Sequence, residues 1–508
     1  MNSISDIFST REAIPLAMDK EHVTDQDIRI VEANETNVKE LTHIDYTDDE
    51  EKKVVRKIDA IVLLIFACIY MFQYLDKIAL SYAAIFGLRT DLKLVGQQYS
   101  WASSVFYFGQ FAFEWVGIYL LHKLPIKQVV GVSIVVWGAI MMCLAAANNF
   151  AGLATVRFFL GLAEGAVAPA FVILTSFWWK KKEQPIRVAT FVSANAMAQI
   201  VGALLLYGCG SIKTAAIKGF RISFLLAGAI TILLGVTFLI VIPLTPATAW
   251  FLNPRQREIA VYRVARERAS FQHTQFDTQQ AWATFKDPRL YLVFFWAVLV
   301  CMTSVVIFGS IVINGLGFSP FRTLVIGLPG PALQLTTIWL GALGTRFFPN
   351  RRGVIQCLLI LPPWTGCIMM YALPYSNKWA LTGGYWLATC NSSVFVVNMS
   401  LIASNFKGHT RKTIVSFAYF IGYCVGSIVG PQMFLATESP TYPTAMKACI
   451  SLYAVYILAQ AAYLVLSYYE NKRRDKLAAE GDESAVPRPA SDEDNRTDLE
   501  DLSFRYVL

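Results

Sequence analysis

Long apolar stretches in the first half of this 508-residue sequence contain ionisable side chains, among them Asp76, Lys77, Arg157 and Glu164. A charged group inside a lipid bilayer is costly, so such residues are functional candidates by default. An arginine can hold a carboxylate through two parallel hydrogen bonds. A carboxyl group that faces an apolar cavity can take up and release a proton near neutral pH. These residue types together would suffice to move an anion with a proton.

The spacing of Arg157 and Glu164 places their side chains together. They are seven positions apart in the sequence, nearly two turns of an α-helix, so they share one helix face. Asp76 lies at a depth similar to that of Arg157 in its own apolar segment, so an ion pair between these two residues is geometrically possible. We predict Asp76 and Glu164 as proton-coupling residues and Arg157 as a substrate-binding residue. The alternative is a purely structural ion pair that locks the helices together.

Five residues in apolar stretches are further predicted to bind a substrate. Asn195 and Gln199 are four apart, so they face one way on a helix and could bind a ligand or merely cross-link helices. Lys77 could contact the substrate or extend to the membrane surface. Asn391 and Tyr423 are polar groups in the second half, whose apolar segments hold essentially no charge.

Other residue types argue against several classes of protein. All five histidines lie outside the apolar stretches, and the nine cysteines form no Cys-x-x-Cys motif. The sequence also lacks a Walker motif, so we expect no ATP-driven step. We therefore predict no cofactor, no metal site and no enzymatic activity. Glu114, a carboxyl group in another apolar stretch, could serve in helix packing or in a gate.

The elements that position these residues are predicted to be membrane-spanning helices. The sequence is 55% hydrophobic and only 16% charged, with a mean hydropathy of +0.46. Apolar stretches of about 20 residues or more recur along it, and each is long enough to cross about 30 Å of hydrocarbon. We predict an all-α membrane protein with twelve transmembrane helices in two six-helix halves. The predicted spans are 58–80, 98–121, 128–147, 151–178, 188–209, 221–243, 289–315, 322–344, 353–373, 380–405, 412–435 and 445–468.

The distribution of charge predicts the orientation of these spans. Residues 51–476 hold 37 bases and 14 acids, and the bases gather in short alternate loops. This is the pattern of cytoplasmic loops rather than of nucleic-acid binding, and it places both termini in the cytoplasm. Both acidic tails are expected to be disordered. The predicted divisions are a tail at 1–57, a first half at 58–243, a central loop at 244–288, a second half at 289–468 and an acidic tail at 469–508.

Several stretches around these positions resemble the motifs of one family. The sequence resembles the major facilitator superfamily in its anion:cation symporter branch, and most of all the fungal allantoate permease-type transporters. The similar stretches are Tyr74-Leu75-Asp76-Lys77, Arg157-Phe158-Phe159-Leu160-Gly161 with Glu164, Trp178-Trp179-Lys180 to Arg187, Asn195 with Gln199, Gly408-His409-Thr410-Arg411-Lys412, Gly422-Tyr423-Cys424 and Gly430-Pro431-Gln432.

The resemblance implies a function and roles for single residues. In this branch, residues at the positions of Asp76 and Glu164 couple protons, and the arginine at the position of Arg157 binds or gates for the substrate carboxylate. It implies a monomer in the plasma membrane that imports a small organic anion with protons by alternating access. The substrate class that it implies is small carboxylates such as allantoate, ureidosuccinate, nicotinate and pantothenate. The alternatives are an exporter of a small acidic metabolite and a non-transporting nutrient sensor.

Overall fold

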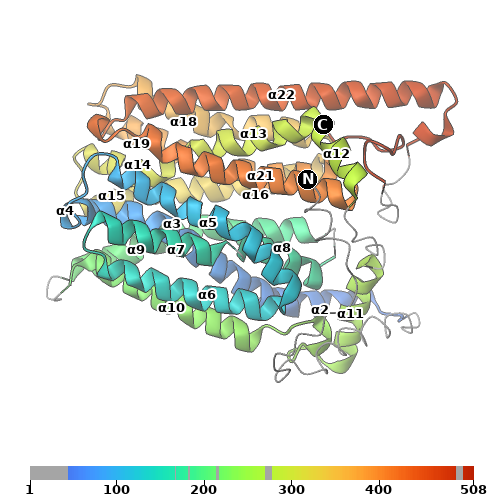
Figure 1. Ribbon diagram of the computed structural model, residues 1–508, viewed down its shortest axis with the longest axis horizontal. Helices are drawn as coiled ribbons and strands as arrows, with labels where there is room; N and C mark the ends of the chain where they lie inside the picture. Colours follow the sequence, from blue (N-terminus) through green and yellow to red (C-terminus); the bar gives the residue numbers. More distant parts are fainter. Residues whose placement is uncertain (1–43, 166, 181–182, 213–216, 269–276, 488–495) are drawn as a thin grey trace, which may run out of the picture. The chain divides into compact units, whose positions relative to one another are not determined.

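The structure, a computed structural model, describes residues 44–165, 167–180, 183–212, 217–268, 277–487 and 496–508. Its helices belong to the compact unit Asp48–Leu508, and the described residues contain no β-strand. Figure 1 shows long helices lying side by side. The predicted disorder of residues 1–43 lies outside the described residues.

The first half begins at α2 and ends before the central loop. A π-helical turn at Asp59–Leu63 joins α2 to α3 without a break, so one helical run covers Asp48–Ile85. The helices of this half are α2 (Asp48–Ile58), α3 (Leu64–Ile85), α4 (Leu88–Asp91), α5 (Gln98–Lys123), α6 (Ile126–Cys143), α7 (Phe150–Glu164), α8 (Val167–Trp178), α9 (Gln184–Ser211) and α10 (Gly219–Val241).

The central loop carries two short helices, and the second half follows. The central helices are α11 (Pro254–Arg268) and α12 (Thr278–Lys286). Those of the second half are α13 (Pro288–Met302), α14 (Val305–Gly315), α15 (Pro320–Gly327), α16 (Pro329–Phe347), α17 (Arg352–Leu359), α18 (Leu361–Ala372), α19 (Lys378–Ala388), α20 (Ser392–Asn405), α21 (His409–Val429) and α22 (Pro443–Ala479).

The helices make up the twelve predicted spans. Ten described helical segments are long and apolar enough to cross a membrane. The 26-residue helix α5 and the successive helices α7 and α8 provide the other two. The predicted all-α fold of twelve transmembrane helices is therefore confirmed.

Most spans of the second half are broken near their middle, and the breaks have local causes. Pro329 opens α16 and Pro362 lies in the first turn of α18, because proline cannot donate the backbone hydrogen bond that would continue the preceding helix. Between α13 and α14, the carbonyl group of Val300 accepts hydrogen bonds from the Thr303 hydroxyl at 2.7 Å and from Asn391 Nδ2 at 3.2 Å. Such side chains satisfy the polar backbone that a broken helix leaves within a membrane.

Glycines allow the closest helix pairs to form. A Cβ atom at Gly161 of α7 would overlap the carbonyl oxygen of Phe106 on α5, and one at Gly109 of α5 would overlap that of Phe158 on α7. Small residues at such crossings let helix backbones approach within a membrane. The α5–α7 pair therefore has a fixed register, which positions the charged residues of α7.

The two halves contact each other toward both ends of the bundle. We call these the α4 end and the α12 end, at the left and right of Figure 1. Toward the α4 end, Phe86, which directly follows α3, packs edge-on against Phe321 of α15, with 5.2 Å between ring centroids. Toward the α12 end, Val192 of α9 belongs to one buried cluster with Ile338 of α16 and Val396 of α20.

The tails differ from the prediction where the structure describes them. Residues 48–57, predicted as part of a disordered tail, form most of α2 and continue into the first span. At the other end, α22 runs beyond the predicted span to Ala479. Residues 496–508 pack against the bundle, with Asp498 fully buried and Tyr506 3% exposed. The predicted disorder of the acidic C-terminal tail is therefore wrong for these parts.

Candidate functional site

Two helices bring the four predicted charged residues together. Asp76 and Lys77 lie on α3, while Arg157 and Glu164 lie on one face of α7, with Glu164 as its last residue. Asp76 and Glu164 are fully buried, and Arg157 is 2% exposed. We call these four residues the central cluster.

Lys77 pairs with Glu164 inside the bundle. Its Nζ lies 2.9 Å from Glu164 Oε2, and its side chain is 15% exposed. The ammonium group also lies over the ring of Phe106, 5.4 Å from the centroid, which favours a cation electrostatically. The alternative in which Lys77 extends to the membrane surface is therefore wrong.

Asp76 has partners other than the predicted one. Trp137 of α6 donates its indole N–H to Asp76 Oδ2. Arg157 Nη1 donates to the backbone carbonyl oxygen of Asp76 at 3.3 Å rather than to its carboxylate. The Asp76–Arg157 ion pair is therefore not formed in this structure, although the two residues are in contact.

Several polar atoms of the central cluster are buried without a hydrogen-bond partner. They are Asp76 Oδ1, Glu164 Oε1, and Arg157 Nε and Nη2. A buried polar atom without a partner costs free energy, so native structures seldom retain one without a reason. The free guanidinium donors suit an anionic group, and the free carboxylate oxygens can accept protons.

Of the predicted pair on α9, Gln199 lies at a contact between the halves. Gln199 donates from Nε2 to Oε1 of Gln334 on α16, and its backbone carbonyl accepts from the Tyr82 hydroxyl at 3.1 Å. Tyr82 and Gln199 line a small cavity with Ser310, Thr323 and Tyr385 from the second half. This cavity does not include the central cluster, so it is a neighbouring feature of the interface between the halves. Asn195 Oδ1 is buried without a partner.

The predicted residues of the second half have different surroundings. Asn391 Nδ2 bonds the Val300 carbonyl at the end of α13, which is a structural role, while its Oδ1 is buried and unpartnered. Tyr423 of α21 meets Tyr107 of α5 edge-on, with 5.9 Å between ring centroids. Tyr423 therefore lies where the two halves touch. Glu114 of α5 is 5% exposed, and its Oε2 has no partner.

Some side chains that hydrogen-bond predicted residues are absent from the sequence-based prediction. Trp137 bonds Asp76, and Gln334 bonds Gln199. A tryptophan in an apolar span is usually a packing residue, so nothing marked Trp137. Gln334 gave a signal, because it is a lone amide within an apolar stretch.

Comparison with known proteins identifies the family. The model of the Major Facilitator Superfamily matches residues 64–431. The chain belongs to this superfamily. An uncharacterized transporter of Schizosaccharomyces pombe is 37% identical over 468 residues, which cover 91% of this chain and 87% of that protein. The allantoate permease of Saccharomyces cerevisiae is 31% identical over 488 residues, which cover 92% of this chain and 89% of the permease.

A solved structure supports the fold of this superfamily member. The partially occluded, inward-open xylose transporter XylE from E. coli matches with a TM-score of 0.59 at 13% identity, covering 80% of this chain and 98% of that one. At that identity the likeness concerns the fold alone. The superfamily member is a multi-pass membrane transporter of a small molecule, and its relatives are transporters rather than enzymes.

Proposed function

We propose that this transporter imports a small organic anion together with protons. Arg157 binds the carboxylate of the substrate, and Asp76 and Glu164 bind the coupled protons. The two halves move around the central cluster, so that the site opens to one side of the membrane at a time. Asn195, Gln199 and Tyr423 are the proposed additional substrate contacts, and Lys77 releases Glu164 when that group is protonated.

The charge balance of the central cluster carries this proposal. With all four groups ionised, two anions and two cations cancel. An anion that entered alone would leave a net negative charge in a site of low dielectric, which is expensive. An anion that enters with a proton leaves the site neutral. In this proposal the unpartnered Arg157 donors receive the anion, and Glu164 Oε1 receives the proton.

The substrate class rests on the relatives as well as on the site. The allantoate permease, 31% identical over most of both chains, is named for a carboxylate. Arginine suits such a ligand because its planar fork matches the two carboxylate oxygens. Allantoate, nicotinate, pantothenate and ureidosuccinate are therefore the first substrates to test.

The proposed orientation follows from the placement of bases. Lys and Arg gather in loops at the α12 end, for example Arg351 and Arg352, which favours the cytoplasmic side. Both termini then lie in the cytoplasm and the α4 end faces outward. We propose the plasma membrane as the location and a monomer as the transporting unit.

Uptake into cells that lack their own permeases tests the function. The chain is expressed, and a panel of labelled carboxylates is supplied with and without a protonophore. We expect accumulation of at least one carboxylate, abolished by the protonophore. Accumulation that survives the protonophore would overturn proton coupling. Efflux from preloaded cells without uptake would favour the exporter, and no flux in either direction across the panel would favour the nutrient sensor.

A single substitution tests the role of Glu164. Glu164→Gln keeps the size of the side chain but cannot exchange a proton. We expect it to abolish gradient-driven accumulation while exchange of internal for external substrate continues. Glu258→Gln is the control, because Glu258 is an exposed residue of α11 with a side chain 56% exposed. Accumulation by Glu164→Gln at the wild-type level would show that Glu164 is not the coupling residue.

A further inference from the structure

A second buried charge cluster lies at the α12 end of the second half. Asp287 caps α13, where its Oδ1 accepts from the backbone N–H of Arg289 at 3.0 Å. Its Oδ2 accepts from Arg411, at the start of α21. Arg289 is 7% exposed and Arg411 is fully buried. These two guanidinium groups need more negative charge than Asp287 alone supplies.

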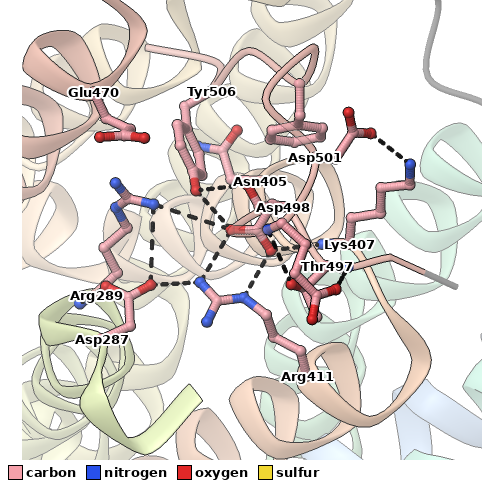
Figure 2. Close-up of polar contacts among 12 residues, drawn as sticks. Asp287, Arg289, Asn405, Lys407, Arg411, Glu470, Thr497, Asp498, Asp501 and Tyr506 are labelled. Atoms are coloured by element: carbon pink, nitrogen blue, oxygen red, sulfur yellow. Dashed lines mark hydrogen bonds and ion pairs between the residues drawn. The ribbon is translucent and has the colours of Figure 1, made fainter. Parts of the chain in front are cut away.

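Asp498, far along the chain, supplies this charge. Its Oδ1 accepts from Arg411 Nε at 2.7 Å and from the backbone N–H of Lys407 at 3.0 Å. Its Oδ2 accepts from Arg411 Nη2 at 3.0 Å and from the Tyr506 hydroxyl at 2.7 Å. Figure 2 shows this carboxylate between Arg289 and Arg411. Both oxygens of Asp498 are thus fully used.

The residues around Asp498 are held through their backbone as well. The amide of Asn405, the last residue of α20, donates to the Val507 carbonyl at 2.9 Å and accepts from its N–H at 2.7 Å. Asn471 of α22 makes the same pair of bonds with Tyr506, at 2.8 and 2.9 Å. Paired backbone bonds of this kind fix both the position and the register of an extended segment.

Two further basic side chains, Arg474 and Lys407, bind residues 498–504. Arg474 of α22, fully buried, donates to the backbone carbonyls of Asp498, Asp501 and Phe504 at 2.7, 3.1 and 2.8 Å. Lys407 Nζ lies 2.7 Å from Asp501 Oδ2. The pKa of Asp501 lies below its ordinary value: burial acts to raise it, but the bonds from Lys407 and Ser503 outweigh this.

A motif residue also fits this contact. Gly408, in the Gly-His-Thr-Arg-Lys stretch, has a φ of +89°, which residues with a side chain rarely adopt. A Cβ atom there would lie 3.0 Å from Thr497 Cγ2. The glycine therefore permits both the turn before α21 and the approach of residue 497.

We propose that the α12 end of the second half carries a docking site for residues 496–508 of the same chain, and that Asp498 is the group that the site recognises. We call residues 496–508 the clasp segment. Docked, it connects the ends of α13, α20, α21 and α22, which belong to one half. The clasp segment thereby lets the second half move as one body during the transport cycle.

At the α12 end of the first half, a non-spanning segment contributes a buried cation, whereas the clasp segment contributes the anion Asp498. Arg187, near the start of α9, pairs with Asp59 at 2.9 Å, as Arg411 pairs with Asp287. There the central helix α11 inserts a cation: Arg263, 1% exposed, binds Glu51 at 3.1 Å and also Glu183. Each half thus has an Asp–Arg pair near this end and a non-spanning segment held there by a buried ion pair, α11 in the first half and the clasp segment in the second.

Hydrogen exchange on the full-length protein tests the docking. In the wild type, the N–H groups of Tyr506 and Val507 are bonded, so peptides that cover 502–508 should exchange slowly. Asp498→Ala leaves Arg411 and Arg289 short of a buried anion and should speed this exchange at least about 100-fold. Glu480→Gln, which removes only an exposed contact 3.7 Å from Lys476, should leave the exchange unchanged.

A charge exchange separates docking from a general loss of stability. Asp501→Lys faces Lys407 with a like charge and should release the clasp segment, and the added substitution Lys407→Glu should restore its protection. Rapid exchange of 502–508 in the wild type would overturn the proposal. So would full protection in Asp498→Ala, or failure of the double variant to recover. None of these outcomes depends on which substrate the protein transports.

Discussion

The central cluster and the cluster around Asp498 both bury charged residues, but they satisfy them differently. In the central cluster, Asp76, Arg157 and Glu164 each keep a buried polar atom without a partner. At the α12 end, both oxygens of Asp498 accept two hydrogen bonds, while Arg289 and Arg411 keep buried donor nitrogens without one. A carboxylate with both oxygens satisfied stabilises one arrangement, whereas a carboxylate with a free oxygen can still take up a proton. The difference indicates a ligand-binding role for the central cluster and a structural role for the cluster around Asp498.

The largest expected effect is on stability, at the cluster around Asp498. Asp498→Ala should lower the free energy of unfolding by about 3–5 kcal/mol, because one partner of a buried ionic network is removed. The KM for substrate should stay within about twofold of the wild type, since the loss is remote from ligand contacts. Thermal melting of the purified protein and the concentration dependence of uptake check this. A changed KM with an unchanged melting temperature would make this cluster a ligand site.

In the central cluster, a substitution should reduce uptake and leave stability nearly unchanged. Arg157→Lys keeps the positive charge but loses the forked donors, so uptake at low substrate concentration should fall about 30-fold or more. Its melting temperature should change little, because Arg157 Nε and Nη2 have no partner and Nη1 bonds only the Asp76 carbonyl, at 3.3 Å. Arg346→Lys, at an exposed position near the end of α16, is the control. Wild-type uptake by Arg157→Lys would remove the two-point contact from the proposed mechanism.

The packing that positions the central cluster can be tested separately from its charges. Gly161→Ala forces a methyl group against the Phe106 carbonyl and should destabilise the protein by about 1–3 kcal/mol, with reduced uptake. Gly208→Ala on α9 is a matched control, because nothing lies within 4 Å of its added Cβ atom. Equal melting temperatures for both variants would show that the α5–α7 contact is looser than described.

The smallest expected effect is on how the stability of the protein depends on pH. Because the folded pKa of Asp501 lies below its ordinary value of 3.8, its pair with Lys407 stabilises the protein at higher pH. This contribution is fully present above the ordinary value and is lost as the pH falls through the lowered one. We expect a smaller loss than for Asp498→Ala, because the clasp segment keeps its contacts to Arg411, Arg474, Asn405 and Asn471. Asp501→Asn should therefore melt with a flatter dependence on pH below about 4. An unchanged slope would exclude this pair as a contributor.

The sequence predicted the spans and the members of the central cluster, but not how its side chains pair. Apolar length sets the spans, and ionisable residues within them stand out from their neighbours. Depth along a helix suggested Asp76 and Arg157 as partners. Pairing also depends on how α3 and α7 are rotated about their axes, and that rotation places Glu164 beside Lys77.

The clasp segment escaped prediction for another reason. Its surroundings in the sequence are acidic and polar, which is typical of disorder. Asp498 becomes ordered through Arg411, 87 positions away, and Lys407, 91 positions away. Local composition carries no information on such distant partners. The Gly408–Lys412 motif indicated that this stretch matters, but it did not indicate that residues 496–508 pack against it.

The clasp segment also bears on how the protein is made. It follows every membrane-spanning helix in the chain, so the ribosome synthesises it after all of them. Until then, Arg289 and Arg411 lack the carboxylate that balances them. A product that stops after α22 would contain all twelve helices and still expose this imbalance. Quality control in the membrane would thus have a chemical mark that distinguishes chains lacking Asp498 from those that carry it.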